Sequence, residues 1–195
     1  MTKTDTRQRL IEAGAKAMLA KSYHAVGLQE ILTEAGVPKG SFYHYFKSKE
    51  DFGVAVIKHY AGEHGKHLQE ALVDRSLSPR ERLWVFFQKY RDFHSFCNCH
   101  EICLIAKLGT EVSDLGCSIQ TAIKQSSDQC LGQFARCIRE GQETGEFDAG
   151  HDPEMLAEFL HSAWEGAMLR MKITQSMKPL DNFITLVFER LLINL

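Results

Sequence analysis

Apolar residues recur along the chain at the spacing of buried helical faces. In the first such segment, Leu10, Ala13 and Ala17 lie three or four residues apart, as on one side of an α-helix. Comparable stripes continue to the end of the sequence, and no segment shows the two-residue alternation of a half-buried strand. The pattern predicts an all-α fold of about nine helices.

Capping residues mark the starts of several of these helices. Ser48 and Asp51 resemble a capping box that opens a long helix over residues 48–73. Ser78 and Asp152 are each followed by proline, which is favoured in the first turn of a helix because its missing N–H has no partner there. These signals divide the apolar stripes into separate helices.

Composition indicates an ordinary globular protein. Of its 195 residues, 44% are apolar and 25% are charged, and no stretch approaches the ~18 uncharged apolar residues of a membrane span. The polar N-terminus lacks the apolar core of a secretion signal, so we expect a cytoplasmic protein without a membrane partner. Motifs for nucleotide binding or hydrolytic catalysis do not occur, so we expect neither an enzyme nor a cofactor.

Charge is distributed unevenly, although the net charge is only −2. Residues 1–60 carry nine Lys and Arg against six Asp and Glu, whereas residues 61–195 carry 14 against 19. The stretch from Val37 to Lys49 has three lysines and no acid. A basic end on an acidic body is typical of a small polyanion-binding head on a larger carrier.

The stretch over residues 28–49 is the most informative in the chain. It reads LQEILTEAGVPKGSFYHYFKSK, with a short helix on either side of a turn at Gly36. Phe42 can pack inward, whereas Lys39 and Tyr43 are left to face outward. This arrangement predicts a helix-turn-helix, whose second helix enters the major groove of DNA.

The same stretch resembles the TetR-type one-component transcriptional repressors. The matching run is Glu34-Ala35-Gly36-Val37-x-Lys39-Gly40-x-Phe42-Tyr43-x-Tyr45-Phe46-x-x-Lys49-Glu50. A later run, Gly141-Gln142-x-x-Gly145-Glu146-Phe147, resembles the loop between the seventh and eighth helices of that family. The resemblance implies a homodimeric repressor that binds double-stranded operator DNA and is released by a small-molecule or electrophilic effector.

The resemblance also implies which residues touch DNA. Lys49, at the start of the fourth helix, would contact a phosphate, and Tyr45 would contact the DNA backbone. Gly27 departs from the family, which often has threonine at that position, so one hydroxyl–phosphate contact is expected to be missing. The implied DNA-binding residues are Leu28, Gln29, Lys39, Gly40, Ser41, Tyr43, His44, Tyr45 and Lys49.

The resemblance further predicts two domains. Residues 1–47 would bind DNA, residues 48–195 would bind the effector and dimerise, and the helix over residues 48–73 would link the two. The last two helices are so apolar that a monomer would expose a large patch. We expect them to form the dimer interface through Leu156, Phe159, Leu160, Ala163, Trp164, Phe183, Leu186, Val187 and Leu191.

Six cysteines, all after residue 96, have three open interpretations. The first is a tetrahedral zinc site, which requires four nitrogen or sulfur ligands. Its ligands would be Cys97, Cys99, His100 and Cys103. The second is plain packing, in which cysteine fills a helix face as a small apolar residue. It suits Cys117, Cys130 and Cys137.

The third interpretation is a reactive thiol at Cys103, in a short helix over residues 103–108. Lys107 lies one helical turn later, and a nearby cation favours the reactive thiolate. The run Cys103-Leu-Ile-Ala-Lys107-Leu108-Gly-x-Glu111-Val112 resembles the TetR-type repressors that control N-ethylmaleimide reductase. That subgroup implies a sensor of quinones, aldehydes or hypohalous acids at Cys103, assisted by a lysine that matches Lys172. The alternatives are a non-covalent inducer in the helical core and a metal-responsive regulator. A ligand cavity in that core would be lined by His94, His161 and Trp164.

Overall fold

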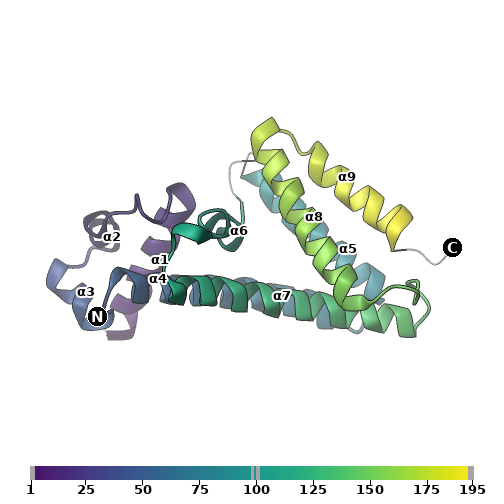
Figure 1. The fold of residues 1–195 in the computed structure, drawn as a ribbon, viewed down its shortest axis with the longest axis horizontal. Helices are drawn as coiled ribbons and strands as arrows, with labels where there is room; N and C mark the ends of the chain where they lie inside the picture. The colour runs from purple at the N-terminus through teal and green to yellow at the C-terminus, as the bar shows by residue number, and fades with distance from the viewer. Residues whose placement is uncertain (1–2, 98, 100–101, 193–195) are drawn as a thin grey trace. The chain divides into compact units, whose positions relative to one another are not determined.

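The computed structural model describes residues 3–97, 99 and 102–192, and every regular element in these ranges is helical. The expected all-α fold is therefore confirmed (Figure 1). Within the same ranges, no helix has the length and apolar character to cross a membrane. The elements are α1 (Lys3–Ala20), α2 (Leu28–Ala35), α3 (Lys39–Tyr45), α4 (Lys49–Val73), α5 (Pro79–Phe96), α6 (Leu104–Gly109), the 3₁₀ turn η1 (Val112–Asp114), α7 (Cys117–Glu143), α8 (Pro153–Thr174), α9 (Lys178–Leu186) and the π-helical turn η2 (Val187–Leu191).

The chain forms two compact units, each assembled from separate parts of the sequence. The first unit contains Met1–His64 and Cys103–Ser127, so α6, η1 and the start of α7 pack with the N-terminal helices. The second contains Gly65–Ile102 and Asp128–Leu195. The units do not follow the predicted boundary after residue 47, because the long helices α4 and α7 each contribute to both. The division of function at that boundary stays a prediction.

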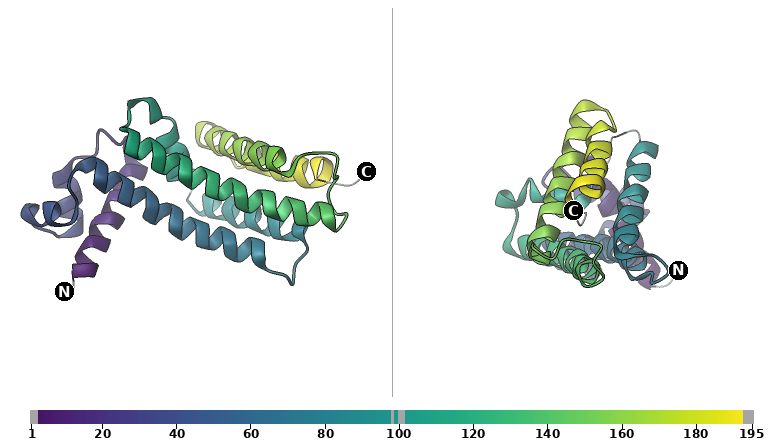
Figure 2. Two further views of the ribbon diagram at one scale, coloured as in Figure 1. Left: turned by 60° about the horizontal axis from the view of Figure 1, so that its bottom comes forward. Right: turned by 90° about the vertical axis from the view of Figure 1, so that its right-hand side faces the viewer.

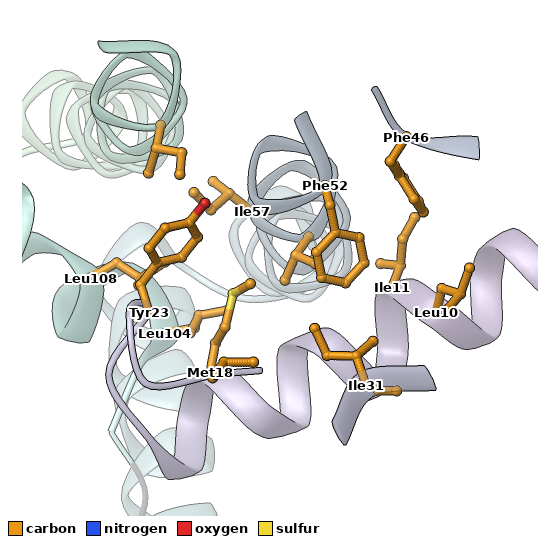
Figure 3. Packing of buried hydrophobic residues seen from close by; sticks show 14 of the residues in the cluster. Leu10, Ile11, Met18, Tyr23, Ile31, Phe46, Phe52, Ile57, Leu104 and Leu108 are labelled. Atoms are coloured by element: carbon orange, nitrogen blue, oxygen red, sulfur yellow. The ribbon is translucent and has the colours of Figure 1, made fainter. Parts of the chain in front are cut away.

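The first unit has an apolar core in which α6 packs with the N-terminal helices. Phe52 of α4 and Leu104 of α6 are both fully buried. Figure 3 shows Leu104 near Met18 of α1, and Leu108 near Tyr23 in the loop that follows α1. Because burial of each large apolar side chain contributes roughly 1.5–3 kcal/mol, these contacts hold α6 firmly against α1.

The second unit is built around a cluster of aromatic rings. The ring centroid of Phe87 of α5 lies 5.0 Å from those of both Trp164 of α8 and Phe183 of α9. Phe134 of α7 and Phe188 of η2 extend the cluster at 5.7 and 6.1 Å from Phe87. Figure 2 shows α8 and α9 side by side in this unit. The rings connect five helical elements of this unit.

The predicted helix starts are present, with one shift at the effector segment. Ser78 forms a complete capping box with Glu81, and the Asp152 carboxylate accepts a hydrogen bond from a backbone N–H in the first turn of α8. The Ser48 hydroxyl likewise accepts the N–H of Asp51 at 3.0 Å. Cys103, expected inside its short helix, is instead the residue before α6, because its ψ of 133° is extended rather than helical.

Candidate DNA-binding surface and effector segment

The turn between α2 and α3 depends on Gly36 and Pro38. Gly36 has a φ of 61°, in the left-handed region that glycine adopts without steric cost. Its N–H and that of Val37 bond to the carbonyls of Thr33 and Leu32 at 3.1 and 2.9 Å. Pro38 lies just before α3, since its ψ of 145° is extended. The predicted helix-turn-helix is therefore present.

The inner side of α3 is anchored by Phe42. This side chain is 1% exposed, and its ring centroid lies 5.3 Å from Phe46 and 5.4 Å from Phe52. A helix of seven residues has little stability of its own. Packing of Phe42 against α4 therefore holds α3 in position and leaves its other side to solvent.

The outer side of α3 carries most of the residues expected to contact DNA. Tyr43 is 61% exposed, and no atom lies within 4 Å of the position that a Cβ on Gly40 would take. A DNA backbone can approach this surface closely. Gln29, Lys39, Gly40, Tyr43 and His44 are exposed, whereas Leu28, Ser41, Tyr45 and Lys49 are half-buried.

Lys49 has partners within the protein, which the sequence did not suggest. Its ammonium lies 4.8 Å from the centroid of the Tyr23 ring and donates to the carbonyl of His24 at 3.4 Å. Burial lowers the pKa of Lys49 below its ordinary value. The pKa of Tyr23 is raised to about 12, mainly by burial and to a lesser extent by the nearby Glu50 carboxylate. A phosphate contact by Lys49 stays a prediction, and these neighbours place its ammonium at the end of α4 nearest the loop after α1.

The segment that begins at Cys103 lies against the core of the first unit. Cys103 is half-buried and packs against that core. The next residue, Leu104, donates its N–H to the Tyr60 hydroxyl at 3.2 Å, and the Tyr60 ring lies 4.1 Å from that of His64. The start of α6 is therefore attached to α4 directly beside the candidate sensor.

Lys107 reaches away along the first unit to the end of α1. Its ammonium donates to the carbonyls of Met18, Leu19 and Lys21 at 2.9, 2.6 and 2.8 Å. These carbonyls lie at the C-terminal end of α1, where backbone acceptors lack helical partners. The expected pairing of Lys107 with the Cys103 thiol stays a prediction. The observed contacts show that Lys107 also connects α6 to the end of α1.

The remaining cysteines differ in their surroundings. Cys137 is 2% exposed, and its thiol donates to the carbonyl of Pro79 at 3.4 Å. Burial raises the pKa of this thiol to about 12, so it is the packing residue that the sequence predicted. Cys130 is half-buried, but Cys117 is exposed at the start of α7 and does not fill a helix face.

The zinc interpretation receives no support in the part of the chain that the structure describes. Cys99 is buried, with its thiol 3.5 Å from the Met177 sulfur, and Cys97 is half-buried. His100 lies outside the described residues. Among the residues that are described, no group of three or more His, Cys, Asp or Glu is placed to hold a metal ion.

The residues expected at the dimer interface separate into buried and exposed groups. Ala163 is half-buried, whereas Phe159, Leu186 and Leu191 are 53%, 61% and 38% exposed. The others are buried inside their own protomer, in α8, α9 and η2, and their place in an interface stays a prediction. They are Leu156, Leu160, Trp164, Phe183 and Val187.

The other residues expected around an effector lie in the second unit, whereas Cys103 and Lys107 lie in the first. His94 and Trp164 are buried, and His161 is half-buried with its Nε2 3.8 Å from Glu165. Lys172 is half-buried in the last turn of α8. Cys103 belongs to the first unit and Lys172 to the second.

Three polar residues of the first unit form contacts that the sequence did not predict. The Arg9 guanidinium donates to the carbonyl of Ala35 at the end of α2. The Glu111 carboxylate accepts the N–H of Tyr23 at 2.9 Å, and Glu50 accepts a backbone N–H at the start of α7. The partners of Arg9 and Glu111 are 26 and 88 positions away, so no local pattern could reveal them.

Two family models match the chain in consecutive parts. Residues 10–56 match the model described as "Bacterial regulatory proteins, tetR family". Residues 79–187 match the model described as "Tetracyclin repressor-like, C-terminal domain". The first match covers the helix-turn-helix described above, and the second extends from α5 into η2.

Individual relatives match over nearly the whole length. The transcriptional repressor DhaR of Mycobacterium sp. (strain GP1) is 38% identical over 192 residues, which cover 98% of this chain and 95% of DhaR. The transcriptional repressor NemR of Escherichia coli K12 is 36% identical over 184 residues, covering 93% and 91% of the two chains. The crystal structure of reduced E. coli NemR superposes with a TM-score of 0.88 at 32% identity, covering 97% of each chain. The resemblance read from the sequence is thus confirmed, and the chain belongs to the TetR family of bacterial regulatory proteins.

Proposed function

We propose that this protein is a dimeric repressor that binds a near-palindromic operator and leaves it when an effector acts. The observation that carries the proposal is the outer side of α3, where Lys39 and Tyr43 are exposed beside the open Gly40. The relatives DhaR and NemR, both named as repressors, support it. A repressor of chromosomal genes works in the cytoplasm, where bacterial DNA lies.

The DNA contacts follow from the chemistry of this surface. The Lys39 ammonium neutralises a phosphate, and the exposed Tyr43 and His44 offer hydrogen bonds to base edges or phosphates. Two-fold symmetry of a dimer places two such helices on half-sites about 34–36 Å apart, one turn of DNA. The symmetry of the protein therefore accounts for the symmetry expected of the operator.

The partner protomer is proposed to contact the exposed side of α8. Met155, Phe159, Leu169 and Ile173 are spaced close to whole helical turns and are 47–62% exposed. The intervening residue Gly166 is exposed and has no neighbour within 4 Å of a Cβ position. Large side chains at both ends and a small residue between them allow two copies of α8 to cross closely.

Cys103 is proposed as the residue through which an electrophile acts. Its thiolate would add to the carbon–carbon double bond of a maleimide or quinone, forming a C–S bond while the displaced π electrons take a proton from water. Lys107, four residues after Cys103, is proposed to assist, because a cation near the thiol favours the thiolate. A covalent adduct can supply the ~5.5 kcal/mol needed to turn a two-state population from 1:99 to 99:1.

A first experiment tests DNA binding. A specific duplex is selected from a random DNA pool, and its affinity is measured for wild type, Lys39→Ala, Tyr43→Ala and the control Lys58→Ala on the exposed surface of α4. Loss of each α3 contact is expected to cost about 1–3 kcal/mol without a change in circular dichroism. Wild-type affinity in both α3 variants would exclude α3 as the reading helix.

A second experiment tests the effector. Wild type and Cys103→Ser are treated with N-ethylmaleimide, modification is followed by mass spectrometry, and DNA release is measured. Wild type is expected to release the duplex and Cys103→Ser to retain it, although exposed Cys117 is alkylated in both. Equal release by the two proteins would reject Cys103 as sensor and favour a non-covalent inducer in the helical core.

A further inference from the structure

Two cations reach from neighbouring helices to the C-terminal ends of α1 and α2. Lys107 of α6 contacts the end of α1, and Arg9 of α1 contacts the end of α2. We propose that Lys107 and Arg9 form a relay through which a displacement of α6 reaches the turn of the helix-turn-helix. The relay itself is a property of the first unit, and its use in induction rests on the proposed function of Cys103.

The first step of the relay is the attachment of Lys107 to α1. The last turn of α1 has no basic residue of its own, although carbonyl ends of helices attract cations. Lys21, which follows α1, does not supply one, because its ammonium pairs with Glu30 at 2.8 Å. Lys107 therefore provides the charge that the end of α1 lacks, from a position 86–89 residues further along the chain.

Further contacts keep this end of α1 together with the segment after α6. The N–H of Tyr23 donates to Glu111 at 2.9 Å, and the His24 ring lies 3.0 Å from the carbonyl of Asp114. In Figure 3 the side chain of Leu108 lies beside the Tyr23 ring. A displacement of α6 must either carry the end of α1 with it or break these contacts together.

The second step of the relay is the attachment of Arg9 to α2. The last turn of α2 also lacks a basic residue, and Arg9 donates to the carbonyl of its final residue, Ala35. A Cβ on the next residue, Gly36, would lie only 2.9 Å from the Arg9 guanidinium. Arg9 and Met18 belong to the same helix, so α1 transmits motion from one attachment to the other as a rigid body.

Two substitutions separate the steps of the relay. Lys107→Met keeps an unbranched side chain and removes the hydrogen-bond donors to the end of α1. Arg9→Met removes the donors to the end of α2 in the same way. Lys58→Met removes a charge from the exposed surface of α4 and serves as the matched control. The readout is hydrogen exchange of two protected amides, Lys21, which bonds to the carbonyl of Ala17, and Val37, which bonds to that of Leu32.

The relay predicts an ordered pattern of exchange in the absence of DNA and effector. Lys107→Met is expected to speed exchange at both Lys21 and Val37 on the order of tenfold, since each charged hydrogen bond stabilises its helix end. Arg9→Met is expected to speed exchange at Val37 alone, and Lys58→Met at neither. Exchange in Lys107→Met that equals the control, or that changes at Lys21 without changing at Val37, would overturn the relay.

A second measurement connects the relay to induction. The ratio of operator Kd after and before N-ethylmaleimide treatment is expected to be large in wild type and in Lys58→Met, and to approach one in Lys107→Met at equal alkylation of Cys103. A Lys107→Met ratio equal to that of wild type would show that induction does not use the relay. If wild type itself keeps its DNA, the role of Cys103 fails, while the exchange pattern still decides whether the relay exists.

Discussion

Gly27 is a position where an added side chain is expected to change both stability and DNA binding. It occupies the residue before α2, with an extended backbone at φ −82° and ψ 140°, and no side-chain cap is formed there. Serine and threonine are favoured at this position because their hydroxyl bonds to a free N–H of the first turn. No atom lies within 4 Å of a Cβ on Gly27, so a larger residue fits.

We therefore expect Gly27→Thr to improve the head in two respects. The cap should raise the free energy of unfolding by a few tenths of a kcal/mol, and the hydroxyl should tighten operator binding by adding a phosphate contact. Urea titration and DNA titration measure the two effects, with Gly27→Ala as the control that adds a Cβ without a hydroxyl. Equal DNA affinity of the threonine and alanine variants would contradict the phosphate contact.

Cys137 predicts a loss of stability in alkaline solution. Burial raises the pKa of its thiol from an ordinary value of 9.0 to about 12, so the folded state holds this proton more tightly than the unfolded state. Its contribution is complete below pH 9.0 and is lost as the pH rises toward 12, at up to about 1.4 kcal/mol per pH unit. Tyr23 adds a parallel loss at higher pH, because its pKa is also raised to about 12.

The measurement is the urea midpoint as a function of pH in wild type, Cys137→Ala and Cys117→Ala. The Cys137 variant starts from a lower stability because it leaves a small cavity, but its decline above pH 9 should be shallower. Cys117→Ala, which changes an exposed thiol, should follow the slope of wild type. Three parallel curves would refute the assignment.

Helix packing in the head requires a glycine where α1 crosses α4. A Cβ on Gly14 would lie 2.3 Å from the Phe52 ring and 2.9 Å from Val56. Gly62, within α4, has no atom within 4 Å of its Cβ position. The same substitution should therefore have opposite effects at these two helical positions.

We expect Gly14→Ala to lower the free energy of unfolding by about 1–3 kcal/mol, because the added methyl group must displace a fully buried ring. Gly62→Ala should raise it by roughly 0.5–1 kcal/mol, since alanine loses less backbone entropy in a helix. Chemical denaturation of both variants measures the pair. A gain in stability from Gly14→Ala would mean that α1 and α4 are packed less tightly than described.

The assembly of two protomers depends on which side of α8 is free. Phe159 is 53% exposed, whereas Leu160, the next residue, is fully buried. A charge at Phe159 would lie inside the proposed interface without a partner, which is costly, but would be solvated in a monomer. The interface can therefore be tested without disturbing the protomer.

Phe159→Glu should shift the protein from dimer to monomer at micromolar concentration, as measured by light scattering. The substitution should also weaken operator binding, because a monomer carries only one α3 and contacts only one half-site. Val73→Glu places the same charge on another exposed apolar residue and should stay dimeric. A dimeric Phe159→Glu protein would move the interface elsewhere.

The sequence by itself determined the helices, most of their starts and the helix-turn-helix. Ser78, Asp152 and Gly36 act through bonds to residues a few positions away, and the apolar period depends only on helix geometry. The exposed side of α3 could be predicted from the sequence for the same reason. In the short helix α3, the buried Phe42 specifies which side remains for Lys39 and Tyr43.

The tertiary structure alone decided which apolar side of α8 is buried and which groups the long lysine side chains contact. Both sides of α8 carry large apolar residues, so periodicity did not distinguish the core residue Trp164 from the exposed Phe159. Lys107 and Lys49 have side chains long enough to reach several partners, and those they contact are 25–89 positions away in the chain. Such contacts depend on how helices cross, which a local pattern does not encode.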